Sequence, residues 1–224
     1  MSAEARRREY LQALDIDTYS LRGAAAPEEA AAPDAPVPSD WQALESAVST
    51  CTRCALHETR TRTVFGVGNR DADWMIVGEA PGQEEDRRGE PFVGRAGQLL
   101  DEMLRALGLD RQSVFIANIL KCRPPDNRDP GQDEAAACRE YLDRQIELVS
   151  PRLILAVGRI AAQRLLDSDA PVGRMRGRRH SLGDGALPVI VTYHPAYLLR
   201  SPTQKRKTWQ DLVLAKQVFD EGGT

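Results

Sequence analysis

Three polar side chains of this chain each stand at the end of a short apolar run, where a sheet would present them to a ligand. Glu79 occupies the turn Gly78-Glu79-Ala80-Pro81-Gly82, which follows the apolar residues 74–77. Asn118 ends a second apolar run, and His194 follows a third. Open α/β sheets bind ligands beyond the carboxyl ends of their strands. The alternative for each residue taken alone is an ordinary turn or strand end.

Four cysteines offer a second kind of chemistry. Cys51 and Cys54 form a Cys-x-x-Cys pair, and Cys122 and Cys138 follow in separate segments. Such a pair chelates thiolate-bound metals, whereas an intracellular chain keeps thiols reduced, so disulfides are not expected. Zinc and an iron–sulfur cluster both accept four cysteines, and the spacing does not choose between them. Either would tie an N-terminal helix to the main domain; unrelated buried cysteines are the alternative.

The pattern of apolar runs predicts the elements that position these residues. Strands are expected over 74–77, 113–120, 152–157 and 187–193, and helices over 40–49, 95–107, 132–149, 159–166 and 204–220. An acidic loop is expected after Gly82, a polar loop over 126–131 and a basic, Gly-rich loop over 171–186. Strands that alternate with helices predict a parallel sheet with helices on both faces. Glu79, Asn118 and His194 should then lie along one edge of that sheet.

Composition and charge set the wider bounds. A chain of 224 residues can hold one sizeable domain and an appendage, and its net charge of −3 gives no hint of a nucleic-acid partner. Residues 171–208, however, hold eight Lys or Arg against one acid. This local excess predicts a phosphate-binding face; a solvated basic surface is the alternative. Without a secretory signal or a long apolar span, we expect a soluble, cytoplasmic protein.

The first 40 residues form an extension ahead of a main domain expected over 41–220. Residues 6–22 are too apolar for a spacer and too short to fold alone, and residues 23–40 hold seven Ala and four Pro, as linkers do. The 6–22 segment resembles the N-terminal peptide of the psi subunit of the bacterial replicative clamp loader. This resemblance implies a tether to replication machinery. The alternative is a disordered tail or a helix folded back on the domain.

The motifs of the main domain together resemble one family. They are the Gly78–Gly82 turn, residues 91–97 (PFVGRAG), Asn118 with residues 121–125 (KCRPP), residues 194–200 (HPAYLLR) and the four cysteines. In order and spacing they resemble the family 4, iron–sulfur uracil-DNA glycosylases. The resemblance implies a three-layer αβα sandwich around a four-stranded parallel sheet. It also implies a [4Fe–4S] cluster ligated by Cys51, Cys54, Cys122 and Cys138, and hence iron rather than zinc.

The residues suit recognition of a uracil that has been extruded from DNA. Phe92 offers an aromatic face on which a flat base can stack, with core packing as the alternative. The amide of Asn118 can donate to uracil O4 and accept from N3–H in one plane. Cytosine reverses both positions, so a fixed amide discriminates against it.

The chemistry of base release assigns the remaining pocket residues. Cleavage leaves negative charge on uracil, and His194 can donate to uracil O2 as that charge grows. Glu79 can orient or activate the attacking water, as a base or purely electrostatically. The family resemblance also points to Glu85 near the pocket and to the backbone of Ala80 at the water site. A related branch binds uracil covalently through a histidine in an inserted loop; residues 126–131 contain none, so free uracil is the expected product.

Strand binding requires a wedge and phosphate contacts. Leu198 resembles the intercalating leucine of the superfamily, with Leu199 as the second choice and a core position as the alternative. Arg200 and Arg176 are expected to contact phosphates of single- or double-stranded DNA. We expect a monomer that acts on DNA in the bacterial cytoplasm. A non-catalytic iron–sulfur DNA-binding module and a glycosylase for other deaminated bases, such as hypoxanthine, are the competing functions.

Overall fold

The computed structural model describes residues 37–183, 185 and 187–222. The chain divides into two units, residues 1–30 and 31–224, and every described residue belongs to the second. The expected docking peptide at residues 6–22 lies outside the described residues. Within the described ranges, no helix has the length and apolar character needed to cross a lipid bilayer.

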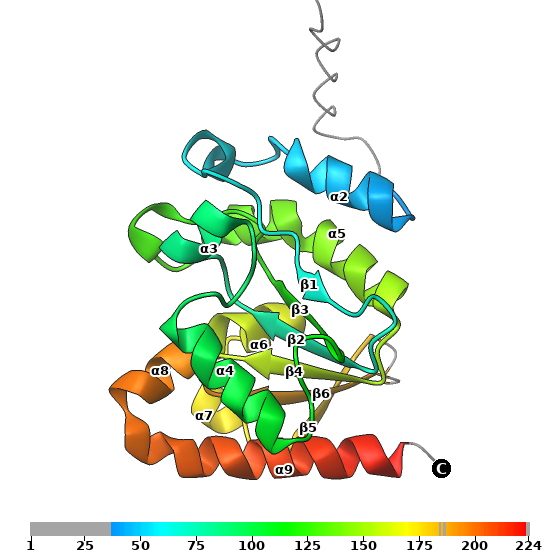
Figure 1. The fold of residues 1–224 in the computed structure, drawn as a ribbon, viewed down its shortest axis with the longest axis vertical. Helices are drawn as coiled ribbons and strands as arrows, with labels where there is room; N and C mark the ends of the chain where they lie inside the picture. Colours follow the sequence, from blue (N-terminus) through cyan, green and yellow to red (C-terminus); the bar gives the residue numbers. More distant parts are fainter. Residues whose placement is uncertain (1–36, 184, 186, 223–224) are drawn as a thin grey trace, which may run out of the picture. The chain divides into compact units, whose positions relative to one another are not determined.

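A six-stranded mixed sheet forms the centre of the second unit, in the order β1-β3-β2-β4-β6-β5 (Figure 1). Its four inner strands pair in parallel: β3 (Val114–Asn118), β2 (Trp74–Gly78), β4 (Leu153–Val157) and β6 (Leu187–Thr192). These are the four predicted strands, so the parallel core of the sheet is confirmed. The short antiparallel strands β1 (Val67–Gly68) and β5 (Arg179–Leu182) extend it at its edges and were not predicted.

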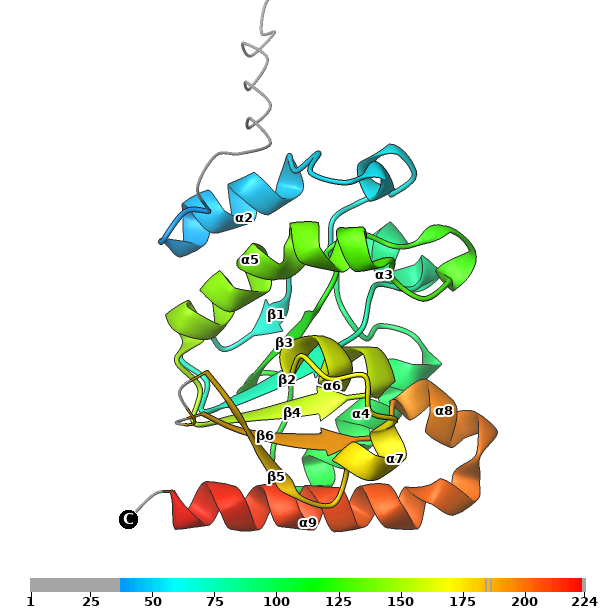
Figure 2. The same cartoon turned by 180° about the vertical axis from the view of Figure 1, so that it is seen from behind.

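Alternate residues of the inner strands face opposite sides of the sheet, which makes three layers. Met75 and Val77 pack with α2 (Trp41–Ser49), α5 (Gln132–Val149) and α6 (Arg159–Leu165). Trp74 and Ile76 pack on the other side with α4 (Arg95–Ala106), α8 (Pro195–Arg200) and α9 (Lys205–Glu221). Figure 1 shows α4 in front of the sheet, and Figure 2 brings α6 to the front. The αβα sandwich is therefore confirmed.

Five of these helices match the predicted ranges within one residue at each end. Two predicted loops, in contrast, contain regular structure. The acidic loop after Gly82 is α3 (Gln83–Arg88), because its acids fill the first turn and its arginines the last, as the helix dipole favours. The basic loop over 171–186 contains α7 (Val172–Met175) and strand β5. Three single turns complete the described elements: η1 (Ala55–Glu58), η2 (Pro125–Asn127) and η3 (Pro202–Gln204).

A buried ion pair holds α9 against the sheet. Asp211 of α9 has no exposed surface. Its carboxylate accepts hydrogen bonds from Nε and Nη2 of Arg176 at 3.0 and 2.8 Å and from Oγ1 of Thr192 at 2.8 Å. Nη2 of Arg176 also donates to the carbonyl of Lys207 at 2.6 Å. The network therefore joins the segment after α7, the end of β6 and the first half of α9.

This network predicts a test of stability. Asp211→Asn should lower the free energy of unfolding by about 3 kcal/mol, because Arg176 keeps a largely buried charge without its partner. The measurement is urea unfolding followed by circular dichroism. Asp220→Asn is the matched control on the same helix: it removes an exposed pair with Lys216 at 2.5 Å and should cost less than about 1 kcal/mol. Equal effects of the two substitutions would contradict the assignment.

Candidate active site

A cavity of about 480 Å³ opens where the parallel strands end. Its lining residues come from the ends of β2, β3 and β6 and from the loops and helices that follow them: Glu79, Ala80, Gly82, Glu85, Phe92, Ala96, Asn118, Asn127, Asp129, His194, Ala196, Tyr197 and Arg200. A hollow of about 450 Å³ beside the starts of β4 and β6 has no comparable set, since its ionisable residues are Glu147, Arg152 and Arg179. The first cavity is therefore the candidate site.

The parallel register of β2 and β3 brings Glu79 and Asn118 to this cavity. Gly78 is the register partner of Asn118. Past the strands the backbone pairing continues, because the amides of Ile119 and Leu120 donate to the carbonyls of Gly78 and Glu79 at 3.0 and 3.1 Å. The start of the turn that carries Glu79 is thus held by two backbone hydrogen bonds.

Gly78 allows the amide and the aromatic ring to meet at the base of the cavity. A Cβ atom at Gly78 would lie 2.4 Å from Oδ1 of Asn118 and 2.7 Å from Cζ of Phe92. Any larger residue at this position would displace one of them. Asn118 is 3% exposed, and its backbone carbonyl accepts a hydrogen bond from Nζ of the buried Lys121 at 2.8 Å. Nζ of Lys121 also donates to Oε1 of Gln145 at 2.5 Å, so the chain after β3 is fixed to α5.

Glu79 has the electrostatic environment of a carboxyl group that can exchange protons near neutrality. Burial and, to a smaller extent, the nearby charge of Asp129 raise its pKa to about 7, while Arg159 opposes the shift. Arg159 and Asp129 form an ion pair at 2.5 Å, which weakens the field of each. Glu79 is therefore ionised above about pH 7 and protonated below it.

His194 is held as a neutral imidazole. It caps the N-terminus of α8, and its Nδ1 accepts a hydrogen bond from the amide of Ala196 at 3.1 Å, which leaves the proton on Nε2. Burial, together with the charge of Arg200, lowers its pKa to about 4. The ring stacks on Phe92 with centroids 5.6 Å apart. On the other side, a Cβ atom at Gly158 would come within 3.0 Å of the His194 side chain, so glycine leaves the ring its space.

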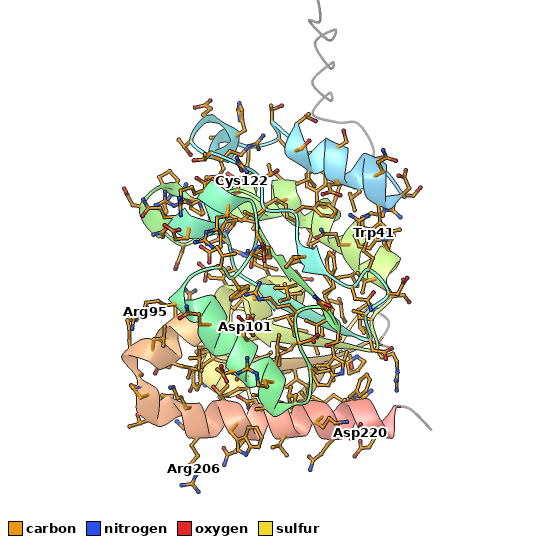
Figure 3. All side chains as sticks on the ribbon, in the orientation of Figure 1. Trp41, Arg95, Asp101, Cys122, Arg206 and Asp220 are labelled. Carbon is orange, nitrogen blue, oxygen red and sulfur yellow. The ribbon has the colours of Figure 1, made fainter. Side chains whose placement is uncertain are left out.

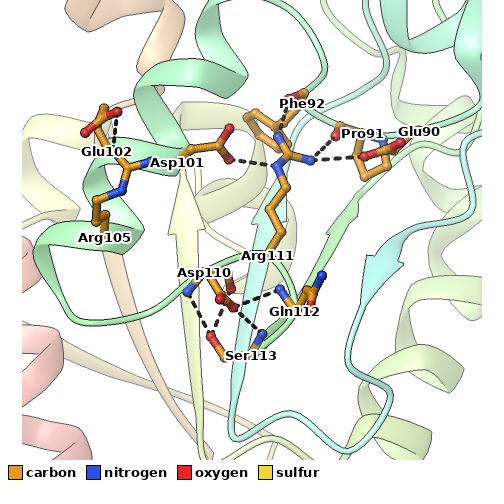
Figure 4. Close-up of polar contacts among 10 residues, drawn as sticks. All are labelled: Glu90, Pro91, Phe92, Asp101, Glu102, Arg105, Asp110, Arg111, Gln112 and Ser113. Atoms are coloured by element: carbon orange, nitrogen blue, oxygen red, sulfur yellow. Dashed lines mark hydrogen bonds and ion pairs between the residues drawn. The ribbon is translucent and has the colours of Figure 1, made fainter.

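Phe92 adopts an unusual backbone conformation that Arg111 maintains. Its φ of 55° lies in the left-handed region, which a bulky residue rarely occupies. The guanidinium of Arg111 donates to the carbonyls of both Pro91 and Phe92 and forms ion pairs with Glu90 and Asp101 (Figure 4). These contacts of Arg111, here called the clamp, stabilise the turn that positions the Phe92 ring. The ion pairs with Glu90 and Asp101 fix the guanidinium of Arg111 in place.

The other predicted pocket residues lie at the same cavity, but two predicted DNA contacts do not. Ala80, Glu85 and Arg200 line it. Leu198 is 1% exposed and packs in the core between α4 and α9, so it is not available as a wedge; Leu199 is 38% exposed. The guanidinium of Arg176 is engaged by Asp211 and the carbonyl of Lys207, so its role is structural and it is not a free phosphate contact.

Sequence reasoning missed several residues that shape this site. Asp129 lies in the polar loop over 126–131 and lines the cavity. The sequence does not show that this loop folds toward Glu79, so it carries no signal for this role of Asp129. Tyr197 and Asn127 also line the cavity. Arg111 reaches Phe92 across 19 residues of sequence, and its local pattern carries no signal of that contact.

The four cysteines line one small cavity under α2, with a free volume of about 10 Å³ (Figure 3 marks Cys122). Several N–H groups point at the sulfurs. Nη1 of Arg60 donates to Cys122 Sγ at 3.1 Å, and the amides of Lys121 and Arg53 donate to Cys138 and Cys51 at 3.3 and 3.5 Å. Burial, together with the neighbouring Cys122 and Cys51, raises the pKa of Cys138 to about 12 although Lys121 opposes the shift, so a bound cation would favour the thiolate there.

The four cysteines that line this cavity are a donor set that thiolate-bound metal groups accept. Within the described residues, no three or more His, Cys, Asp or Glu side chains are arranged closely enough to hold a metal ion. Four sulfurs around a common space, with N–H donors directed at them, are what a polynuclear iron–sulfur cluster requires.

Comparison with known proteins agrees with this architecture. The model of the uracil DNA glycosylase superfamily matches residues 65–213. The type-4 uracil-DNA glycosylase of Archaeoglobus fulgidus is 45% identical over 170 residues, which are 73% of this chain and 85% of that protein. The type-4 enzyme of Thermotoga maritima is 44% identical over 79% of this chain and 93% of its own length.

A more distant relative helps to place the chain within the superfamily. The type-5 uracil-DNA glycosylase of Thermus thermophilus is 30% identical over 68% of this chain and 76% of that protein. The identity to type-4 proteins is thus clearly higher. The chain belongs to the type-4 branch of the uracil-DNA glycosylase superfamily.

Proposed function

We propose that this protein is a DNA-repair glycosylase that extrudes uracil from DNA and hydrolyses its N-glycosidic bond. The products are free uracil and an abasic site, which base excision repair then processes. The observation that carries the proposal is the cavity that Glu79, Phe92, Asn118 and His194 share at one sheet edge. The names of the type-4 relatives support the same activity.

Uracil is recognised by Phe92 and Asn118. The base stacks on the ring, and the buried amide donates to O4 and accepts from N3–H. Because Asn118 is 3% exposed and packs on Gly78, its side chain has little freedom to adapt to cytosine. A site that depends on fixed hydrogen bonds rejects such an analogue more strongly than an apolar pocket does.

His194 and Glu79 act on the reacting atoms. As the bond between C1′ and uracil N1 breaks, its electron pair moves onto the base, and Nε2–H of the neutral His194 donates to O2. The oxygen of a water molecule bonds to C1′, and the ionised Glu79 orients that water and favours the sugar cation. The water loses one proton as this bond forms and the uracil anion takes one up, so the products are neutral uracil and an abasic site. The backbone of Ala80 lines the water site, and Glu85 lies at the cavity wall. Both products leave the protein free, since no histidine lies in residues 126–131 to form a covalent bond.

Contacts to the DNA strand come from α8. Arg200 lines the cavity and has no acidic partner in an ion pair among the described residues, so it is free to bind a phosphate. Leu199 takes the place of Leu198 as the proposed wedge, because only Leu199 has the exposure to enter a base stack.

A [4Fe–4S] cluster bound by Cys51, Cys54, Cys122 and Cys138 is part of the proposal. The cluster would join the segment after α2 to the end of β3 and to α5. Its role is structural, because the cysteines line a cavity separate from that of Glu79 and His194.

The context of the enzyme completes the proposal. The proposal includes a main domain over residues 41–220 that acts as a monomer on DNA in the bacterial cytoplasm. Residues 6–22 contact the replicative clamp loader; this rests on sequence resemblance alone. A pull-down with clamp loader that is unchanged by deletion of residues 1–22 would exclude the contact.

Uracil release from a defined oligonucleotide tests the activity. The protein should cleave U:G, U:A and single-stranded uracil substrates, with hypoxanthine as the competing base. His194→Ala and Asn118→Ala should each lower the single-turnover rate by about 10²–10³. His180→Ala, which is not a cavity residue, is the control. Near wild-type rates for His194→Ala with an unchanged unfolding midpoint would show that its assigned role is wrong.

The pH dependence of the rate reports on Glu79. The rate should fall as the pH drops below about 7, because protonation of Glu79 removes the charge that acts on water and sugar. His194 stays neutral over this range, since its pKa is about 4.

Asp129→Asn should shift the midpoint of this fall in rate to lower pH, because it removes the charge that raises the Glu79 pKa and frees Arg159, which lowers it. Asp133→Asn, at an exposed position on α5, should leave the midpoint unchanged. If the midpoint does not move in Asp129→Asn, a group other than Glu79 controls the fall in rate.

The cysteines predict a visible signature. Purified protein should be brown and contain iron and acid-labile sulfide in equal amounts. Cys122→Ser should reduce both the colour and the yield of folded protein, because a ligand that joins two segments is lost. Zinc in stoichiometric amount, with colourless active protein, would refute the cluster.

A further inference from the structure

Two exposed side chains stand out beside the candidate active site. Leu199 and Trp209 are the large apolar residues with the greatest exposure among the described residues, at 38% and 49%. One lies on α8 and the other near the start of α9, so both belong to the corner that these helices form. Single exposed apolar residues are common, but half of a tryptophan surface in water has a large free-energy cost.

Unpaired cations surround this corner. Lys205, Arg206 and Lys207 form the first turn of α9, which contains no acid. Positive charge at a helix N-terminus opposes the helix dipole, so these residues do not stabilise α9. None of the three forms an ion pair with a described acid, whereas Lys216 further along the helix does. Figure 3 shows Arg206 projecting away from the helix. The arrangement therefore suits an anion that is not part of the chain.

A groove of about 250 Å³ lies between α4 and α9 next to these cations. Its walls are mainly apolar and include Leu99, Met103, Leu198, Trp209 and Leu212. Its charged lining residues are Lys205 and Glu102, and Glu102 is paired with Arg105 at 2.5 Å. Thr208 also lines the groove, but the residue is 2% exposed and its Oγ1 is buried. A flat apolar ligand attached to a negative charge would suit both the apolar walls and the cations.

We propose that an unpaired base of the DNA strand that flanks the extruded nucleotide stacks on Trp209. Lys205, Arg206 and Lys207 hold the adjoining phosphates. Stacking on aromatic side chains between basic residues is the usual mode of single-strand binding. The inference rests on the proposed function only in taking DNA as the ligand.

The width of α8 sets the distance that the DNA strand must cover between the uracil cavity and the groove. His194, Tyr197 and Arg200 of this segment line the uracil cavity, and Leu198 lines the groove, so the helix separates the two. A helix with its side chains is about 10–12 Å across. Stacked nucleotides rise about 3.4 Å each, so about three of them span the helix.

Tryptophan fluorescence tests the contact without catalysis. A uracil-free single-stranded oligonucleotide should quench the emission of the full-length protein, whereas a fully paired duplex of equal length should quench it less. Trp209→Phe should abolish most of the quenching and retain binding, because Trp74 is 3% exposed and Trp41 packs against Phe65 and Phe115. Trp209→Ala should weaken binding about tenfold, as expected for the loss of one stacked base. Gln210→Ala, at the next exposed position, is the matched control.

Substrate length provides the second measurement. The KM of wild-type protein should fall as single-stranded uracil substrates are extended, on one side of the uracil, far enough to reach the groove. Trp209→Ala should lose most of this gain, and Gln210→Ala should keep it. Quenching that persists in Trp209→Phe, equal quenching by duplex, or equal affinities of Trp209→Ala and Gln210→Ala would each overturn the proposal. Protein that shows the quenching but releases no uracil would instead refute the proposed function and leave this contact standing.

Discussion

The site depends on one constraint: parallel strands that start at different points of the sequence must end at the same edge of the sheet. The register of β2 with β3 sets Gly78 opposite Asn118, and the register of β4 with β6 brings Val157 opposite Thr192, two residues before His194. Side chains from three distant segments therefore reach one cavity without any long loop to place them. The backbone hydrogen bonds of the sheet, rather than the polar residues themselves, supply the positional accuracy.

Close packing then converts this rough convergence into a defined site. Gly78 lies against the amide of Asn118 and the ring of Phe92, and Gly158 lies against His194. Because glycine has no Cβ atom, Asn118, Phe92 and His194 can occupy these positions without a steric clash. The electrostatic environment follows from the same packing, because burial raises the pKa of Glu79 and lowers that of His194. An acid that ionises near neutrality and an imidazole that stays neutral thus arise from one enclosed geometry.

Much of this could be predicted from the sequence, and the failures have identifiable causes. The four inner strands are continuous apolar runs, so their existence and parallel pairing were predictable, and with them the meeting of Glu79, Asn118 and His194. Strand β1 has two residues and β5 alternates in burial, which left no apolar run to detect. The burial of Leu198 and the pairing of Arg176 with Asp211 depend on how α8 and α9 pack. Local sequence does not contain that information.

The clamp on Phe92 has a consequence for the energetics of each encounter with DNA. Arg111 already holds the carbonyls of Pro91 and Phe92, and Asp101 and Glu90 already hold Arg111 (Figure 4). The loss of conformational entropy in that turn therefore occurs once, when the chain folds. A nucleobase that binds later therefore contacts a preorganised surface. A base of a different shape is not accommodated by rearrangement of this turn, so its poorer fit lowers its affinity.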